Sequence, residues 1–101
     1  MSNRPTLSVV VPMYKEEDVA QLLVERVHEG LSNYHGNWEL ICVDDGSPDN
    51  TVDRLKAAAE QFGDQVRVIE LQRNFGQTAA MQAGIDAARG ELIVTMDGDL
   101  Q

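Results

Sequence analysis

Short apolar runs rich in β-branched residues alternate along the chain with longer segments that carry a helical period. The runs are Leu7 to Val11, Leu40 to Val43, Val66 to Leu71 and Leu92 to Met96. Their length and composition predict four β-strands. Because the first, second and fourth runs are continuously apolar, we expect these three strands to be buried on both faces of a sheet.

Three helices are predicted between the strands. The first two carry apolar residues at three- and four-residue spacing, on the stripes Val19, Leu22, Leu23, Val27, Leu31 and Val52, Leu55, Ala59, Phe62. The third segment, Thr78 to Ala88, is rich in alanine, which allows close packing on a sheet. Asp49 to Thr51 offers capping oxygens before the second helix, and Gly63 and Gly90 follow the second and third helices.

This alternation predicts an α/β domain in which a parallel sheet of four strands lies between layers of helices, a three-layer α/β/α arrangement of the Rossmann type. In such sheets ligands bind beyond the carboxyl ends of the strands. Polar and glycine residues follow all four predicted strands, so they meet on one rim. Those of chemical interest are Pro12, Tyr14, Glu16, Asp44, Asp45, Gly46, Arg73, Asn74, Gly76, Gln77, Asp97, Asp99 and Gln101.

Asp97, Asp99 and Gln101 occupy alternate positions after the fourth apolar run. Side chains two residues apart in extended backbone point to the same side, so these three oxygen-bearing groups converge. Hard divalent cations prefer such ligands, and the metal usually also carries phosphate oxygens. The run therefore predicts a metal and phosphate site. The alternative is that these residues, like the second acidic pair Asp44 and Asp45, only cap helices and polarise turns.

Composition narrows the classes of function. A chain of 101 residues holds one domain at most, and a formal net charge of −9 with only eight scattered Lys and Arg residues argues against a nucleic-acid partner. The single Cys42 cannot form an intramolecular disulfide, and Leu7 to Val11 is too short for a signal-peptide core or a membrane span. We therefore expect a soluble, cytoplasmic chain. Residue patterns for zinc sites, Ser-His-Asp triads and P-loops are absent from the sequence.

Three segments carry a resemblance to a known family. SVVVPMYKEE, ICVDDGSPDNT and RNFGQTAAMQAGIDAARGELIVTMDGDLQ resemble, in this order and spacing, the start of an inverting family 2 glycosyltransferase with the GT-A fold. Within that family the sequence is most similar to the polyprenyl-phosphate glycosyltransferases, the relatives of dolichyl-phosphate mannose synthase. The resemblance extends from Leu7 to Gln101.

The resemblance implies roles for individual rim residues. Residues expected in the nucleotide pocket are Pro12, Tyr14, Glu16, Asp45, Arg73, Asn74, Gly76 and Asp97, with Asp45 on the base or ribose. Asp97 and Asp99 match the family's D-x-D motif and are the expected catalytic and metal-binding residues; Gln101 helps to complete a site for Mg²⁺ or Mn²⁺. Two residues depart from the family pattern, because Lys15 stands where Asn is usual and Gly98 replaces a common Ala.

The implied reaction transfers a sugar from a UDP-sugar or GDP-sugar to a polyprenyl phosphate, with inversion at the anomeric carbon. A phosphomonoester acceptor has a second pKa of about 6, so it is largely ionised at neutral pH and needs a strong general base less than a sugar hydroxyl does. The resemblance further implies that residues 1–101 form the nucleotide-sugar-binding N-terminal part, that the acceptor half is absent, and that the full-length protein acts at the cytoplasmic face of the membrane.

Other interpretations remain open at this point. The chain could be a catalytically incomplete nucleotide- and metal-binding module, or a receiver-like signalling domain, although receivers place their acidic residues after the first and third strands. Without further strands beside it, the run Leu92 to Met96 forms an apolar sheet edge, which predicts self-association.

Overall fold

The computed structural model describes residues 5–97, so Gly98, Asp99 and Gln101 lie outside the described residues. It contains four strands and three α-helices, as predicted. In chain order they are β1 Leu7–Met13, α1 Ala20–Leu31, β2 Trp38–Asp44, α2 Thr51–Phe62, β3 Val66–Glu70, α3 Gln77–Ala87 and β4 Leu92–Thr95, with a 3₁₀ turn at Gly63–Gln65 between α2 and β3. No described helix combines the length and hydropathy needed to cross a bilayer.

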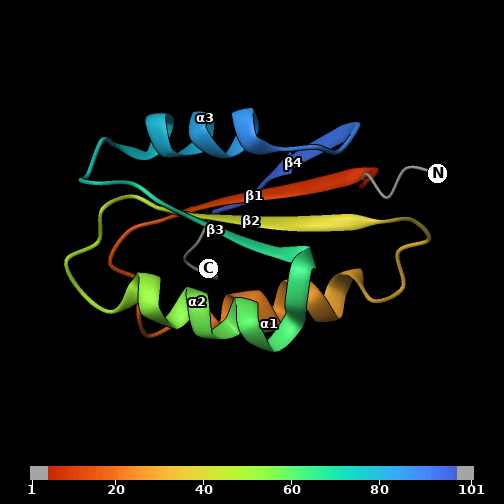
Figure 1. Ribbon diagram of the computed structural model, residues 1–101, viewed down its shortest axis with the longest axis horizontal. Coiled ribbons are helices and arrows are strands. Elements are labelled where there is room, and N and C mark those ends of the chain that lie inside the picture. Colours follow the sequence, from red (N-terminus) through yellow and green to blue (C-terminus); the bar gives the residue numbers. More distant parts are fainter. Residues whose placement is uncertain (1–4, 98–101) are drawn as a thin grey trace.

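All the strands are parallel, and their order across the sheet is β3-β2-β1-β4. Helices α1 and α2 cover one face of the sheet and α3 covers the other (Figure 1). The predicted three-layer α/β/α arrangement is therefore confirmed. Because the chain proceeds from β1 to β3 in one direction and then returns to place β4 on the other side of β1, the strand order reverses between β1 and β4. Such a reversal opens a crevice at the carboxyl ends of the two strands.

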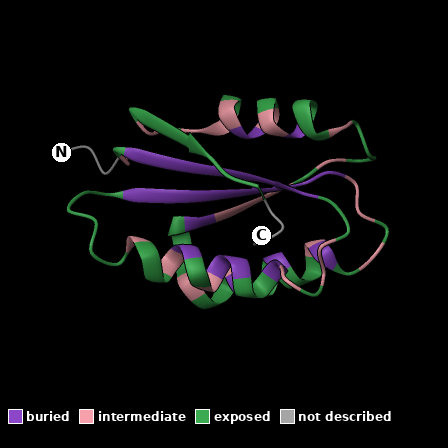
Figure 2. Ribbon diagram, turned by 180° about the vertical axis from the view of Figure 1, so that it is seen from behind, coloured by how far each residue is buried: buried purple, intermediate pink, exposed green. Residues whose placement is uncertain are grey.

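Two apolar layers hold the helices on the sheet. The face toward α1 and α2 buries side chains such as Leu23, Leu40 and Leu55, whereas the face toward α3 buries a smaller set around Val10 and Ile41 (Figure 2). Helix α3 lies close to the sheet, because a Cβ added at its Gly84 would come within 2.3 Å of Val10 Cγ1. The expectation that the alanine-rich helix packs close to the sheet is confirmed, and the contact at Gly84 holds α3 against β1.

Strand β4 departs from the prediction of burial on both faces. Its apolar side chains are exposed, Leu92 to 61% and Val94 to 41%, and β4 pairs with β1 alone among the described residues. The prediction was wrong for this strand because a continuous apolar run does not reveal how many strands lie beside it. The expectation of an open apolar edge is confirmed instead.

A buried carboxylate links the amino-terminal ends of the strands. Glu39 in β2 is only 4% exposed and accepts hydrogen bonds from Ser8 Oγ at 2.6 Å, the Arg89 N–H at 2.7 Å and Arg67 Nη1 at 2.9 Å. Burial alone would raise the pKa of Glu39, but these hydrogen bonds, with the Arg67 charge, hold it below its usual value. The Gly90 N–H donates in turn to Ser8 Oγ at 2.8 Å. Glu39 thus ties the segment that leads into β4 to the interior strands.

Candidate functional site

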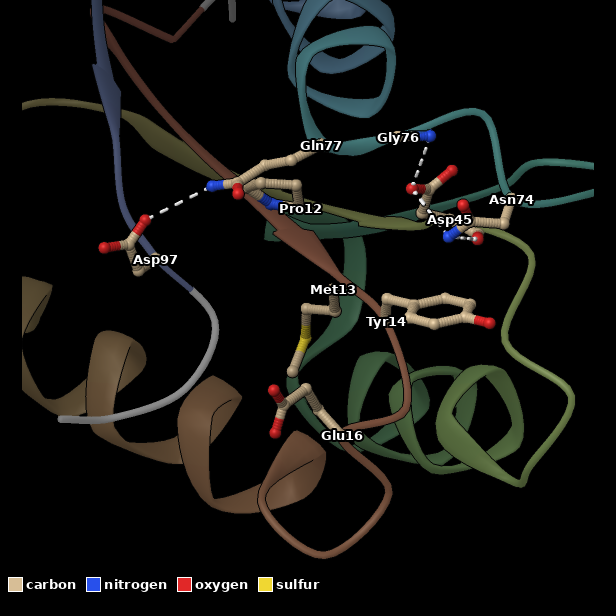
Figure 3. A pocket seen from close by; sticks show the side chains of 9 residues that line it. All are labelled: Pro12, Met13, Tyr14, Glu16, Asp45, Asn74, Gly76, Gln77 and Asp97. Carbon is tan, nitrogen blue, oxygen red and sulfur yellow. Dashed lines mark hydrogen bonds between the residues drawn. The ribbon is translucent and has the colours of Figure 1, made fainter.

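A cavity of about 550 Å³ lies at the carboxyl ends of the strands, where the strand order reverses. It is lined by Pro12, Met13, Tyr14, Glu16, Asp45, Asn74, Gly76, Gln77 and Asp97. Asp45 and Asn74 lie at one end of the cavity, and Asp97 lies at the other (Figure 3). Residues from all four strand ends therefore meet in one place, as the parallel topology predicted.

The structure brings together nearly all the residues expected in the nucleotide pocket. Only Arg73 among them is missing from the lining; its guanidinium lies instead over the Phe75 ring, with its carbon 4.5 Å from the ring centroid. Met13 and Gln77 line the cavity although the resemblance assigned them no role. Both residues follow predicted strand ends, so both could have been found from their place on the rim, although the apolar Met13 side chain carries no polar group that would mark it.

The loop after β1 is tied to the loop after β2. The Lys15 N–H donates to Ser47 Oγ and the Glu16 N–H donates to Thr51 Oγ1, each at 2.9 Å. Lys15 has a φ of 55°, a left-handed conformation that Asn adopts more easily than Lys. The departure from Asn at this position therefore places a strained residue beside Tyr14, whose ring centroid is 5.3 Å from Lys15 Nζ.

Asp45 organises the segment that follows β3. The residue is 3% exposed, and its carboxylate accepts hydrogen bonds from the Phe75 N–H at 2.9 Å, the Gly76 N–H at 3.0 Å and Asn74 Nδ2 at 3.2 Å. A carboxylate has about four acceptor positions, so most of its capacity is used within the chain. The contact of Asp45 with a base or ribose stays a prediction. In this structure its carboxylate holds the segment from Asn74 to Gly76 in place.

The neighbouring Asp44 does not line the cavity. Its side chain is buried on the sheet face toward α1 and α2; one oxygen accepts the Ser47 N–H at 3.2 Å, and the other has no hydrogen-bond partner among the described residues. Burial is the main reason why the pKa of Asp44 is raised. The hydrogen bonds from Ser47 lower this pKa, and the nearby Glu70 and Asp49 carboxylates raise it further. The acidic pair thus divides between the two faces of the sheet.

The oxygen ligands that the rim offers fit a hard divalent cation in part. The charged residues among the described cavity lining, Glu16, Asp45 and Asp97, are all carboxylates. No group of three acidic, His or Cys residues within 5–97 is arranged to hold a metal, and the predicted ligands Asp99 and Gln101 lie outside this range. Mg²⁺ is commonly bound by one or two carboxylates together with substrate phosphates, so Asp97 suits a cation that arrives with a nucleotide diphosphate.

Comparison with known proteins identifies the family. Residues 8–101 match Glycosyl transferase family 2. The chain belongs to this family. Its resemblance to family 2 enzymes is thereby confirmed, and the receiver-like alternative is set aside.

The relatives include lipid-phosphate sugar transferases that are considerably longer. The chain is 58% identical over 95 residues to dodecaprenyl-phosphate galacturonate synthase of Rhizobium johnstonii, covering 94% of this chain and 28% of that protein. It is 44% identical over 95 residues to undecaprenyl-phosphate 4-deoxy-4-formamido-L-arabinose transferase of Serratia proteamaculans, covering 94% and 29%. This family 2 chain therefore spans less than a third of the length of these curated relatives.

Solved structures share the fold. Mannosyltransferase PcManGT from Pyrobaculum calidifontis, in complex with GDP-Man and Mn²⁺, superposes with a TM-score of 0.75 at 27% identity over 95% of this chain and 28% of that one. Glucosyl-3-phosphoglycerate synthase from Mycobacterium tuberculosis, in complex with Mn²⁺, UDP and glucosyl-3-phosphoglycerate, gives 0.74 at 28% identity over 96% and 34%. The α/β fold of the family 2 chain matches that of GT-A glycosyltransferases.

Proposed function

We propose that this chain is the nucleotide-sugar-binding part of a glycosyltransferase and that its cavity takes the donor. The observation that carries the proposal is the convergence of the family's motif residues, from all four strand ends, on one cavity at the strand-order reversal (Figure 3). Its volume of about 550 Å³ is typical of a site for a small molecule. The donor is a UDP-sugar or GDP-sugar, a class supported by the nucleotides bound to the two structural relatives.

The two ends of the cavity serve different parts of the donor. We infer that the base and ribose lie toward Tyr14 and Asp45, because Tyr14, a residue that is 38% exposed, offers an aromatic ring there. The diphosphate lies toward Asp97 at the other end. Since the described charged residues of the lining are carboxylates, they would repel a bare diphosphate, and Mg²⁺ or Mn²⁺ held by Asp97 would offset this repulsion. The Mn²⁺ in both structural relatives supports a divalent cation.

The reaction requires little from the chain beyond positioning. The cation, when bound, neutralises charge that develops on the departing nucleotide diphosphate. Asp97, together with Asp99 of the D-x-D motif, holds this end of the donor, while the residues around Asp45 fix the nucleoside. With the donor held in this way, a phosphate oxygen of the acceptor forms a bond to the anomeric carbon from the side opposite the nucleotide diphosphate. The bond between that carbon and the diphosphate oxygen breaks, the nucleotide diphosphate leaves, and the configuration inverts.

The acceptor is a polyprenyl phosphate in the complete protein, which acts at the cytoplasmic face of the membrane. The names of the Rhizobium johnstonii and Serratia proteamaculans relatives support this acceptor class. Because those relatives are more than three times as long as the matched segment, we infer that residues 1–101 form the donor-binding part and that acceptor binding requires the further length seen in the relatives. The chain alone then binds nucleotide without turnover.

Calorimetric titration tests the proposal. UDP and GDP are titrated into the chain with Mn²⁺, and again with EDTA. One of them is expected to bind more tightly when Mn²⁺ is present, and Asp97→Asn is expected to remove most of that gain. Asp86→Asn, which makes the same change on the exposed side of α3, serves as the matched control and leaves binding unaltered. Absence of binding by either nucleotide to the folded chain would overturn the proposal.

A further inference from the structure

Gln77 connects two elements that meet at the cavity. It is the first residue of α3, and its side chain extends across the cavity toward the end of β4, where Nε2 donates to Asp97 Oδ1 at 3.4 Å (Figure 3). The hydrogen bond is long, but it joins a helix to a strand that lies on the far side of β1 from β2. Asp97 follows the last residue of β4 by two positions, and the hydrogen bond from Gln77 ties its side chain to α3.

The backbone that carries Gln77 is held firmly. Asp45 binds the Gly76 N–H at 3.0 Å, and the Ala80 N–H closes the first helical turn on the Gly76 carbonyl at 3.0 Å. One turn later along the same face, Gly84 packs so closely on Val10 that the helix cannot shift toward the sheet. The backbone position of Gln77 is therefore well defined, and a residue that orients another side chain requires such a fixed backbone.

Gln77 offers Asp97 a neutral hydrogen-bond donor. The charged lining residues within 5–97 are carboxylates, which cannot donate to Asp97 when ionised, whereas the Gln77 amide donates to it. By binding Oδ1 it orients the carboxylate and leaves Oδ2 available as a ligand. Groups that orient metal-binding carboxylates in this way commonly change metal affinity by about 10- to 100-fold when they are removed.

We propose that Gln77 is a positioning residue that orients Asp97 for the divalent cation of the donor complex. This inference rests on the proposed function, because it assumes that a nucleotide diphosphate and a cation meet at Asp97. It assigns to Gln77 a role in metal-dependent affinity rather than in contact with the nucleotide. Gln77 is exposed, so replacing it leaves the buried core intact.

The test compares Gln77→Leu, which keeps the side-chain bulk but loses the donor, with Gln82→Leu. Gln82 lies on the same helix and donates to Asp86 Oδ1 at 2.8 Å, away from the cavity, so it is a matched control. Affinity for Mn²⁺ is measured from the electron paramagnetic resonance signal of free Mn²⁺ at saturating UDP or GDP. Nucleotide affinity in EDTA is measured separately by calorimetry.

Gln77→Leu is expected to weaken Mn²⁺ binding by about 10-fold or more and to leave nucleotide affinity in EDTA unchanged, while Gln82→Leu changes neither. Gln77→His, which retains an N–H donor, is expected to recover part of the loss. Equal Mn²⁺ affinity in the original chain and Gln77→Leu overturns the inference and leaves the proposed function standing. A loss of nucleotide affinity in EDTA as large as the loss of Mn²⁺ affinity has the same consequence, because Gln77 would then be a nucleotide contact. Failure of the original chain to bind either nucleotide overturns both.

Discussion

Gly46 and Arg73 approach so closely that no side chain fits between them. A Cβ added to Gly46 would lie 2.1 Å from the carbonyl carbon of Arg73, and Gly46 also has a φ of +70°. The contact joins the segment after β2 to the segment after β3 and lets Asp45 reach the backbone N–H groups beyond Arg73. The glycine is thus required by the shape of the cavity wall.

Gly46→Ala is expected to destabilise the chain by about 2–4 kcal/mol, because it adds a clash with backbone to the strain of a left-handed alanine. Gly63→Ala is the matched control: Gly63 has a φ of +82°, but a Cβ added there would meet no atom within 4 Å, so only the strain applies and the loss is smaller. Urea unfolding of both variants measures the difference. Equal losses would contradict the close contact.

Asp45→Asn is expected to loosen the segment after β3. In the original chain two backbone N–H groups donate to the two carboxylate oxygens, whereas Asn would replace one of these oxygens with an NH₂ group that cannot accept a hydrogen bond. The Phe75 and Gly76 amides, bound at 2.9 and 3.0 Å, should exchange with deuterium faster, and stability should fall by about 1–3 kcal/mol. Exchange measured by NMR checks this residue by residue. Unchanged protection of both amides would show that the carboxylate does not hold the segment.

Lys15→Asn is expected to stabilise the chain by up to about 1 kcal/mol, because Asn tolerates the φ of 55° better than Lys does. Lys15→Ala provides the control at the same position, since alanine removes the charge but keeps the strain. Thermal unfolding compares the three chains. A gain in Lys15→Ala equal to that in Lys15→Asn would attribute the effect to charge instead of backbone conformation.

Glu39 gives the stability of the chain a dependence on pH. Its pKa in the folded chain is below the usual 4.5, so its contribution is fully present above pH 4.5 and is lost as the pH falls through the lower folded value. Glu39→Gln is expected to be about 2–4 kcal/mol less stable at pH 7 and to lose less on acidification. Denaturant unfolding between pH 7 and pH 3 measures both, with exposed Glu60→Gln as the control. Parallel acid profiles for the original chain and Glu39→Gln would contradict the role of the carboxylate.

The open edge of β4 is expected to drive self-association of this chain with a second copy. The strand carries no charged residue, and its side chains are exposed along its whole length. Because each chain has a net charge of −9, added salt should strengthen the association by screening the repulsion. Sedimentation at increasing concentration and salt measures it. Val94→Lys should abolish it by placing a charge on the edge, whereas Asn33→Lys, in an exposed loop, should not. A monomer at all concentrations would refute the prediction.

The fold could be predicted because apolar runs and helical stripes are local in sequence. The ends of β2 were missed because Glu39 and Asp44 interrupt the apolar pattern on either side of Leu40 to Val43, although both are buried in the strand. Glu39 was missed for a related reason: a charge in a strand normally faces solvent, and its partners Ser8, Arg67 and Arg89 lie far away in the sequence.

The site could be predicted as a rim because parallel strands all end on the same side. Which rim residues turn into the cavity depends on loop conformation instead. Arg73 lies over the Phe75 ring. Asp44 lies on the same face of β2 as Leu40 and Cys42, which pack toward α1 and α2. Gln77 reaches the cavity only because α3 begins beside it. Such orientations follow from contacts between segments that the sequence does not place near one another.

The wall of the cavity is assembled from residues 12 to 97, so nearly the whole described chain must fold before the cavity exists. A molecule that binds there can have little affinity for the unfolded chain. It will therefore stabilise the fold by mass action, by about 2.7 kcal/mol at 100 times its dissociation constant. The melting temperature of the chain becomes a sensor of occupancy, and unknown donor sugars can be ranked by thermal shift without any acceptor or catalytic turnover.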